Sequence, residues 1–317
     1  MFLISLAVIH IVCLILLILY CRLTVGICKC SKHLYGKVVI VTGANSGVGF
    51  ETAKDLAARG ARLILACRNE ERGTTAREKI VSATGNNDVH YRHLDLASLA
   101  SVRKFAADII KNEKRVDILI NNAGIFYVDN IKTEDNLFVG MQTNHFAPFL
   151  LTSLLLPLLK SSAPSRIINV ASTSYMRSKI DFENLNMELE NKDTYTCHKA
   201  YCMTKLCNVY TTLELDRRLR GTGVTVNCLH PGFVDTNIVT TIQWPLFRFI
   251  KPVVRLTMKS AWEGAQTSIY LAVAPELENV SGHYFSDCRE RGLTKKAQDV
   301  DIAKKLWEVS ESLVKLK

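Results

Sequence analysis

Residues 37–50 read KVVIVTGANSGVGF, an apolar run followed directly by a glycine-rich turn. A second apolar run, RLILAC, occupies residues 62–67, at the distance expected of a strand–helix–strand unit. Glycine lets the backbone turn sharply and approach a diphosphate, while the start of the next helix offers free N–H groups to the anion. The pattern predicts a dinucleotide-binding turn, although an ordinary strand-to-helix turn is the alternative. The predicted cofactor contacts here are Gly43, Asn45, Ser46, Gly47, Val48 and Gly49.

The end of the second apolar run indicates which dinucleotide binds. NAD sites usually place an acidic residue here to hold the ribose 2′-hydroxyl. This chain has Cys67 and then Arg68, and its first acidic residues follow only at positions 70 and 71. An arginine can pair with a 2′-phosphate, which NAD lacks. We therefore predict NADP(H), with a solvated loop arginine as the alternative.

The rest of the chain continues the alternation of strands and helices. Further strands are predicted over residues 89–95, 116–120, 166–170, 224–229 and 283–285, and helices over residues 137–160 and 199–220. Such alternation predicts a single Rossmann-type α/β domain at residues 37–317, a doubly wound parallel sheet with helices on both faces.

Two strand ends supply further candidate cofactor contacts, because ligands of such sheets bind outside the carboxyl ends of the strands. Asp95 and Leu96 follow the third strand, where the Asp95 carboxylate can accept a hydrogen bond from an adenine amino group or cap the next helix. Asn122, Ala123 and Gly124 follow the fourth strand, and small and amide residues suit a backbone that passes close to a cofactor.

The N-terminus predicts a membrane anchor. Residues 2–20 contain no charged side chain, and nineteen residues at ~1.5 Å each approach the ~30 Å hydrocarbon thickness of a bilayer. We predict a transmembrane helix at residues 1–22 and a basic linker at residues 23–36, with a cleaved signal peptide as the alternative. Positive charges at positions 22, 29, 32 and 37 place the following domain in the cytoplasm.

Composition excludes several functional classes. The 317 residues are 48% hydrophobic with a net charge of +10, which suits a large core and excludes a disordered chain. No lysine–arginine run, aromatic–basic repeat or metal-ligand spacing is present, so we predict neither nucleic-acid binding nor a metal site. The positive charge suits a membrane surface, and the ten cysteines include no C-x-x-C pair, which indicates reduced thiols.

Tyr201 and Lys205 lie four residues apart in a predicted helix, so the phenol and the ammonium share one face. A phenol titrates near pH ~10 and is a poor acid–base at neutrality. Because a nearby cation commonly lowers an acid's pKa by ~1–3, Lys205 is predicted to lower the pKa of Tyr201. Tyr201 would then donate a proton to a carbonyl as hydride arrives from the cofactor.

With these motifs the chain resembles the short-chain dehydrogenase/reductase superfamily and, within it, the retinol dehydrogenase branch. The matching stretches, from residue 36 to about residue 310, are residues 42–49, 66–68, 94–96, 121–124, 144–145, 169–172, 201–205, 230–232, 263–268 and 284–287.

The resemblance implies a role for each matching residue. Tyr201 would be the acid–base, and Lys205 would tune its pKa and hold the nicotinamide ribose. Ser172 would hydrogen-bond the substrate oxygen, and Asn144 would place a water in the proton relay. The nicotinamide amide site would be lined by Pro231, Gly232 and Thr236.

The resemblance also implies an activity. It is NADP(H)-dependent interconversion of a hydrophobic alcohol and its aldehyde, retinol and retinal first, by a single-pass protein of the endoplasmic reticulum membrane. Family members commonly pair through the helices that carry Asn144 and Tyr201, which implies a homodimer. The alternatives are a steroid, farnesol-like isoprenoid or lipid-aldehyde reductase and, from another class, a non-catalytic membrane-tethered scaffold.

Four local features qualify these expectations. Ser172 follows Ala171 where family members carry paired serines, so Thr173 or Ser174 can share its role. The loop from Ser172 to Tyr201 is long and contains a charged segment at residues 181–193.

Residues 244–252 combine bulky apolar groups with cations, which suits either a lid over a lipid substrate or a surface loop. Pro148 lacks an N–H and is expected to leave the Asn144 carbonyl free for the relay water or merely to kink its helix.

Overall fold

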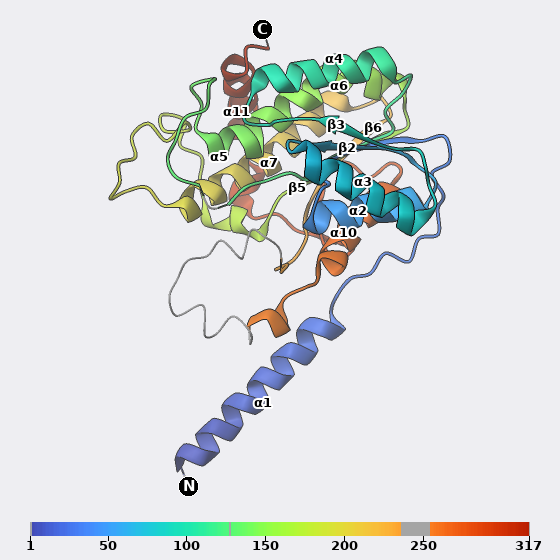
Figure 1. Cartoon of the computed structure of the whole chain (residues 1–317). Coiled ribbons are helices and arrows are strands. Elements are labelled where there is room, and N and C mark those ends of the chain that lie inside the picture. Colours follow the sequence, from blue (N-terminus) through green and yellow to red (C-terminus); the bar gives the residue numbers. More distant parts are fainter. Residues whose placement is uncertain (1, 127, 236–253, 317) are drawn as a thin grey trace.

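The structure of the protein, a computed structural model, describes residues 2–126, 128–235 and 254–316, with side chains from residue 12 onward. A central sheet lies between two layers of helices, and one long helix extends away from this body (Figure 1). The chain ends on the far side of the body from that helix.

The strands form one sheet in the order β3-β2-β1-β4-β5-β6-β7-β8. Neighbouring strands are parallel from β3 to β7, and β8 is antiparallel to β7. The strands are β1 (Val38–Thr42), β2 (Arg62–Cys67), β3 (Val89–His93), β4 (Ile118–Asn121), β5 (Ser165–Val170), β6 (Val224–His230), β7 (Tyr284–Ser286) and β8 (Arg289–Arg291). The strand order reverses at β1, and at such a crevice doubly wound sheets bind dinucleotides.

Helices cover both faces of the sheet, as the alternation predicts. The longer helices are α2 (Gly47–Ala58), α3 (Glu70–Thr84), α4 (Leu99–Asn112), α6 (Ala147–Ser161), α7 (Cys197–Leu219), α10 (Ala261–Val273) and α11 (Val300–Leu313). On one face α2 packs between α3 and α10, and on the other α4 packs on α6 while α11 packs on α7. Strand residues alternate between the two cores: Val39 contributes to the core beneath α2, and Ile40 to the core beneath α6 and α7.

The predicted helix over residues 137–160 is interrupted. It consists of α5 (Val139–Met141), a π-helix η1 (Gln142–Phe146) and α6, with Pro148 in the first turn of α6. The π-helix therefore lies directly before Pro148, whose missing N–H disturbs the helical hydrogen-bond ladder. That the Asn144 carbonyl holds a relay water stays a prediction.

Other differences from the predicted elements are small. The third strand ends at His93 rather than Asp95, and the fourth is Ile118–Asn121 rather than residues 116–120. Sequence reasoning missed β8, because its three exposed charged residues form no apolar pattern. It also missed the 3₁₀ turns η2 (Thr173–Arg177), η3 (Pro275–Leu277) and η4 (Lys295–Gln298).

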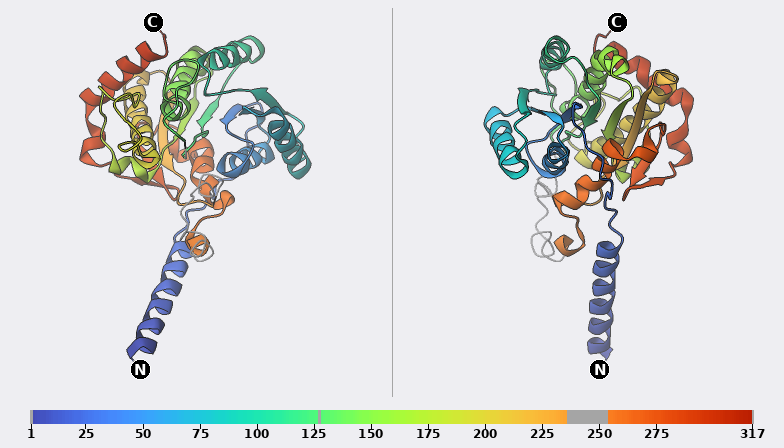
Figure 2. Two further views of the ribbon diagram at one scale, coloured as in Figure 1. Left: turned by 60° about the vertical axis from the view of Figure 1, so that its left-hand side comes forward. Right: turned by 90° about the vertical axis from the view of Figure 1, so that its right-hand side faces the viewer.

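The N-terminal helix α1 spans Phe2–Leu23 and extends away from the domain in all three views (Figures 1 and 2). The residue after its last turn is Thr24, whose N–H and hydroxyl both donate to the Tyr20 carbonyl, at 3.0 and 2.7 Å. Among the residues described, no helix combines the length and apolarity needed to cross a membrane.

Candidate active site

The glycine turn has the geometry that its sequence predicts. Gly43 has φ +66°, a left-handed conformation that favours glycine. A Cβ on Gly49 would lie 2.4 Å from the Asn122 side-chain nitrogen and 2.4 Å from the Gly43 carbonyl oxygen. The start of α2 therefore lies against the ends of β1 and β4, closer than any other residue type would allow.

Thr42 and Asn122 tie these two strand ends together. The Thr42 hydroxyl accepts hydrogen bonds from the N–H groups of Asn122 and Ala123, both at 3.0 Å. The Asn122 side chain in turn donates to the Thr42 carbonyl at 2.9 Å. Asn122 thus holds the turn through its backbone N–H and its side-chain nitrogen.

A cavity of about 860 Å³ opens at the carboxyl ends of the strands. It brings together all the predicted cofactor and catalytic residues except Asn144 and Thr236, and Thr236 lies outside the described residues. The predicted residues that line it are Gly43, Asn45, Ser46, Gly47, Val48, Gly49, Arg68, Asp95, Leu96, Asn122, Ala123, Gly124, Ser172, Tyr201, Lys205, Pro231 and Gly232.

The lining suits a dinucleotide cofactor. Ser46 caps α2 without a side-chain hydrogen bond, so its side chain satisfies none of the N–H groups of the first turn, which face an anion site. Arg68 is exposed at the cavity and forms no ion pair with any part of the chain that the structure describes. The turn can hold a diphosphate, and Arg68 presents a guanidinium at the same cavity.

The contacts of Asp95 distinguish its two predicted roles, an adenine contact and a cap of the next helix. The cap of α4 is Ser98, whose side chain accepts from the Ser101 N–H at 3.2 Å, so the capping interpretation of Asp95 is wrong. One Asp95 carboxylate oxygen accepts from the Ala97 N–H at 2.9 Å, and the residue lines the cavity. Contact with an adenine stays a prediction.

Ser172, Tyr201 and Lys205 converge on the same cavity from β5 and α7. Lys205 is buried, and its ammonium donates to the Val170 carbonyl at 2.9 Å. It lies 5.5 Å from the centroid of the Tyr201 ring. The Ser172 hydroxyl accepts from the Ser174 N–H and donates to the Ser174 hydroxyl, both at 3.2 Å. Of the two substitutes considered, Thr173 is exposed and Ser174 is the direct partner of Ser172.

The pKa values differ from the sequence-based expectation. Burial raises the pKa of Tyr201 to about 12, against a smaller lowering by a hydrogen bond with Ser172. Burial also lowers the pKa of Lys205 to about 8. The prediction that Lys205 lowers the pKa of Tyr201 is therefore wrong for the protein alone. The ammonium is directed at the Val170 carbonyl, and desolvation outweighs its field.

Asn144 lies behind the cavity wall, where its side chain is fully engaged. Its oxygen accepts from the Ile125 N–H at 2.8 Å, and its nitrogen donates to the Ile125 carbonyl at 2.8 Å and the Thr204 hydroxyl at 3.1 Å. A Cβ on Gly124 would lie 3.4 Å from both the Asn144 oxygen and the Lys205 ammonium. Asn144 thus fixes the backbone after β4 against α7. A relay water would therefore contact the Asn144 backbone carbonyl rather than its side chain.

Comparison with known proteins agrees with this site. Residues 37–182 match the family model described as short chain dehydrogenase. The chain is 47% identical to human retinol dehydrogenase 13 over 297 residues, covering 92% of this chain and 89% of that protein. It is also 47% identical to human retinol dehydrogenase 14 over 300 residues, with coverage of 89% and 88%.

The chain belongs to the short-chain dehydrogenase/reductase superfamily, in its retinol dehydrogenase branch. Its fold is similar to the crystal structure of an uncharacterised protein from Mycobacterium paratuberculosis. The TM-score is 0.73 at 32% identity, and the match covers 90% of this chain and 95% of that one.

This short-chain dehydrogenase has a cavity wall that sequence reasoning missed. The Phe126 ring packs edge-on to the Tyr201 ring at 4.8 Å between centroids and lies 6.4 Å from the His198 ring. Met176 and Phe233 line the same cavity. His198 was detectable, because it precedes Tyr201 by three residues on the same helix face. Phe126, Met176 and Phe233 lie in loops or a short turn, which carry no periodic signal.

Proposed function

We propose that this protein is an NADP(H)-dependent oxidoreductase that interconverts a hydrophobic alcohol and its aldehyde, with retinol and retinal as the first candidates. The observation that carries the proposal is one cavity lined by Ser172, Tyr201 and Lys205 together with the glycine turn and Arg68. The relatives named retinol dehydrogenases support the substrate class.

A bound nicotinamide would supply hydride to the carbonyl carbon of the substrate. Tyr201 would donate its phenolic proton to the carbonyl oxygen, and the Ser172 hydroxyl would hydrogen-bond that oxygen. With a pKa near 12, Tyr201 holds its proton at neutral pH. This is the form that reduction of a carbonyl requires. Lys205 would then stabilise the phenolate that remains.

Other chain residues would hold and orient the cofactor. Arg68 would pair with the 2′-phosphate, and the start of α2 would bind the diphosphate. Asp95 and Leu96 would lie at the adenine, and Pro231, Gly232 and Thr236 at the nicotinamide amide.

An apolar wall supports a lipid substrate. Phe126, Val139, Met176 and Phe233 line the cavity and offer apolar surface to a substrate, beside Arg177 and His198. A steroid, a farnesol-like isoprenoid or a lipid aldehyde would satisfy the same wall, so these remain the alternative substrates. The scaffold alternative is weaker, since it gives no reason for Ser172, Tyr201 and Lys205 to share one cavity.

We also propose that α1 is a single-pass anchor in the endoplasmic reticulum membrane, with residues 23–36 as linker and residues 37–317 as the catalytic domain facing the cytoplasm. The uncharged run of residues 2–20 and the basic residues after it support this topology. Resistance of the protein to carbonate extraction, with the domain open to protease in intact microsomes, is the expected result. Protection of the domain would contradict the orientation.

A homodimer through the helices carrying Asn144 and Tyr201 faces an obstacle. The α11 residue Trp307 packs edge-on to Phe149 of α6 at 4.7 Å and stacks with Arg218 of α7 at 4.4 Å. Because α11 lies against both helices, it covers part of the surface through which they would pair, and a dimer would use the parts of α6 and α7 that α11 leaves uncovered.

The function is tested with the purified full chain in detergent. NADPH and NADH oxidation are measured against retinal, farnesal, steroid ketones and medium-chain aldehydes. We expect NADPH-dependent reduction of retinal. Equal rates with NADH would contradict the role of Arg68, and no turnover on any substrate would favour the scaffold alternative.

A further inference from the structure

Lys259 packs against the turn of residues 231–235, which follows β6. Its N–H donates to the Phe233 carbonyl at 2.8 Å, and its carbonyl accepts from the Asp235 N–H at 2.9 Å, so its backbone is paired with the strand end. A Cβ on Gly232 would lie 2.6 Å from Cδ of Lys259, and the ammonium is 3.5 Å from the Pro231 carbonyl oxygen. The lysine side chain therefore packs against the backbone of Pro231 and Gly232.

Asp287 sets the position of this ammonium. The two groups form an ion pair at 2.5 Å, with only 13% of the Lys259 side chain exposed. Burial raises the pKa of the Asp287 carboxyl, but hydrogen bonds from Lys259 and the Gly26 N–H outweigh it and hold the pKa below its ordinary value. Asp287 and Cys288 have φ +55° and +54°, an unusual pair of left-handed residues at the β7–β8 turn. The Thr267 hydroxyl, which accepts from the Cys288 N–H at 3.2 Å, holds this turn against α10.

The segment that follows α1 completes this arrangement. The Gly26 N–H donates to the same Asp287 oxygen at 3.1 Å. A Cβ on Gly26 would lie 2.0 Å from the Asp287 carbonyl oxygen, so only glycine fits. The Cys28 N–H donates to the side chain of Gln266 on α10 at 3.1 Å. Residues 26–28 are therefore fixed to the domain at two points.

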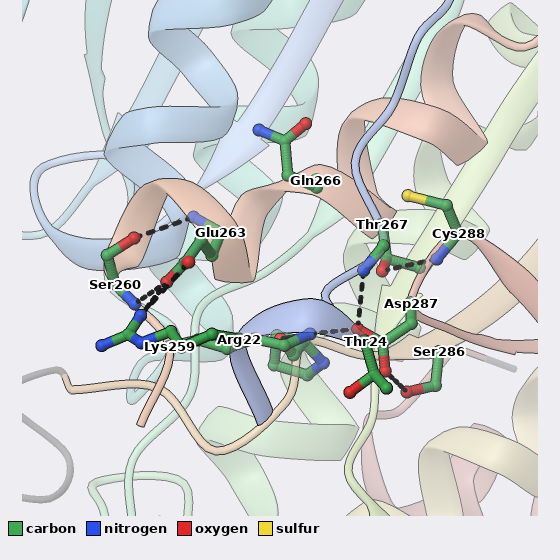
Figure 3. Close-up of polar contacts among 12 residues, drawn as sticks. Arg22, Thr24, Lys259, Ser260, Glu263, Gln266, Thr267, Ser286, Asp287 and Cys288 are labelled. Atoms are coloured by element: carbon green, nitrogen blue, oxygen red, sulfur yellow. Dashed lines mark hydrogen bonds and ion pairs between the residues drawn. The ribbon is translucent and has the colours of Figure 1, made fainter. Parts of the chain in front are cut away.

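Arg22 adds a contact at the start of α10, next to Lys259 in sequence. Its guanidinium is 3.1 Å from a Glu263 carboxylate oxygen. Glu263 also accepts from the Ser260 N–H at 2.6 Å, and the Ser260 hydroxyl accepts from the Glu263 N–H at 3.2 Å, which forms a capping box. Figure 3 shows Arg22, Lys259, Glu263 and Asp287 in one group, between the end of α1 and the start of α10.

We propose that Lys259 is a positioning residue for the Pro231–Gly232 turn, and that residues 22–28 hold it in place through Asp287 and Glu263. The segment after the anchor is then part of the cofactor site rather than a passive tether. This inference rests on the proposed function, because it requires that a nicotinamide cofactor bind at the turn. Loss of the Lys259–Asp287 pair would let the turn shift away from the position in which it contacts the cofactor.

The test uses the full chain with Lys259→Met, which keeps most of the side-chain stem, and Asp287→Asn, which keeps the shape. The dissociation constant of NADPH is measured by the change in its fluorescence on binding, without substrate. We expect each variant to weaken NADPH binding by about tenfold, which is the contribution of about one hydrogen bond between the turn and the cofactor. The double variant should bind no more weakly than Lys259→Met, because the two residues act through one contact. The KM for NADPH should rise more than kcat falls.

Gly26→Ala examines the N-terminal segment, and Gly292→Ala is its control, since a Cβ on Gly292 would meet nothing within 4 Å. Lys304→Met, which removes an exposed ion pair with Asp301 on α11, is the control for lost charge. We expect weaker NADPH binding for Gly26→Ala and wild-type binding for both controls. Unchanged NADPH binding by Lys259→Met and Asp287→Asn would overturn the inference but leave the proposed function intact. Failure of the wild-type protein to bind NADPH would overturn the proposed function and the inference together.

Discussion

Replacing Lys205 by methionine should stabilise the cofactor-free protein while abolishing catalysis. Burial lowers the pKa of Lys205 from 10.5 to about 8, which corresponds to about 3 kcal/mol of unfavourable free energy for the charged form at neutral pH. The Val170 carbonyl loses its donor in the variant, at a cost of about 1–2 kcal/mol. A net gain of about 1–2 kcal/mol at pH 7 follows, or a rise in Tm of about 2–6 °C for a domain of this size.

The stability difference between Lys205→Met and the wild type should depend on pH. Between pH 8 and 10.5 the unfolded chain holds the lysine proton that the folded chain has released, so wild-type stability rises with pH across this window. Below pH 8 the folded state carries the full penalty. The advantage of Lys205→Met should therefore shrink from pH 8 upward and reverse near pH 10, where only the lost hydrogen bond remains.

The assay is thermal unfolding of the cofactor-free wild type and Lys205→Met at pH 7, 8, 9 and 10, followed by tryptophan fluorescence. Lys304→Met, with an exposed side chain, is the control and should differ little from wild type at any pH. A Lys205→Met protein that is less stable than wild type by one constant margin from pH 7 to pH 10 would refute the reasoning.

Three further outcomes are expected. Arg68→Ala should weaken NADPH binding by about tenfold and leave NADH binding unchanged, because a hydrogen bond to a charged group contributes about 1.5–3 kcal/mol; an equal loss for both cofactors would exclude a 2′-phosphate contact. Tyr201→Phe should abolish turnover and retain NADPH binding, and surviving activity would show that another group donates the proton. Gly49→Ala should lower stability by about 1–3 kcal/mol and weaken NADPH binding, because its Cβ would lie 2.4 Å from the Asn122 side chain; binding equal to that of Gly292→Ala would contradict the tight turn.

Sequence alone was sufficient wherever a local pattern carries the information. The apolar run of residues 62–67 predicted β2 with its correct bounds, and the Tyr201–Lys205 spacing predicted that both side chains share one face of α7. The glycine spacing predicted the turn between β1 and α2. Each inference depends on neighbours within a few residues, which the order of amino acids states directly.

The tertiary structure decided what depends on distant neighbours. The raised pKa of Tyr201 and the lowered pKa of Lys205 follow from burial by segments remote in the chain. For Tyr201 the spacing alone predicted the opposite direction. The hydrogen bond between Gly26 and Asp287 joins residues 261 positions apart, and no local sequence pattern predicts it. Electrostatics depends on the dielectric around a group and on the charges that packing brings near it, and both exist only in the folded chain.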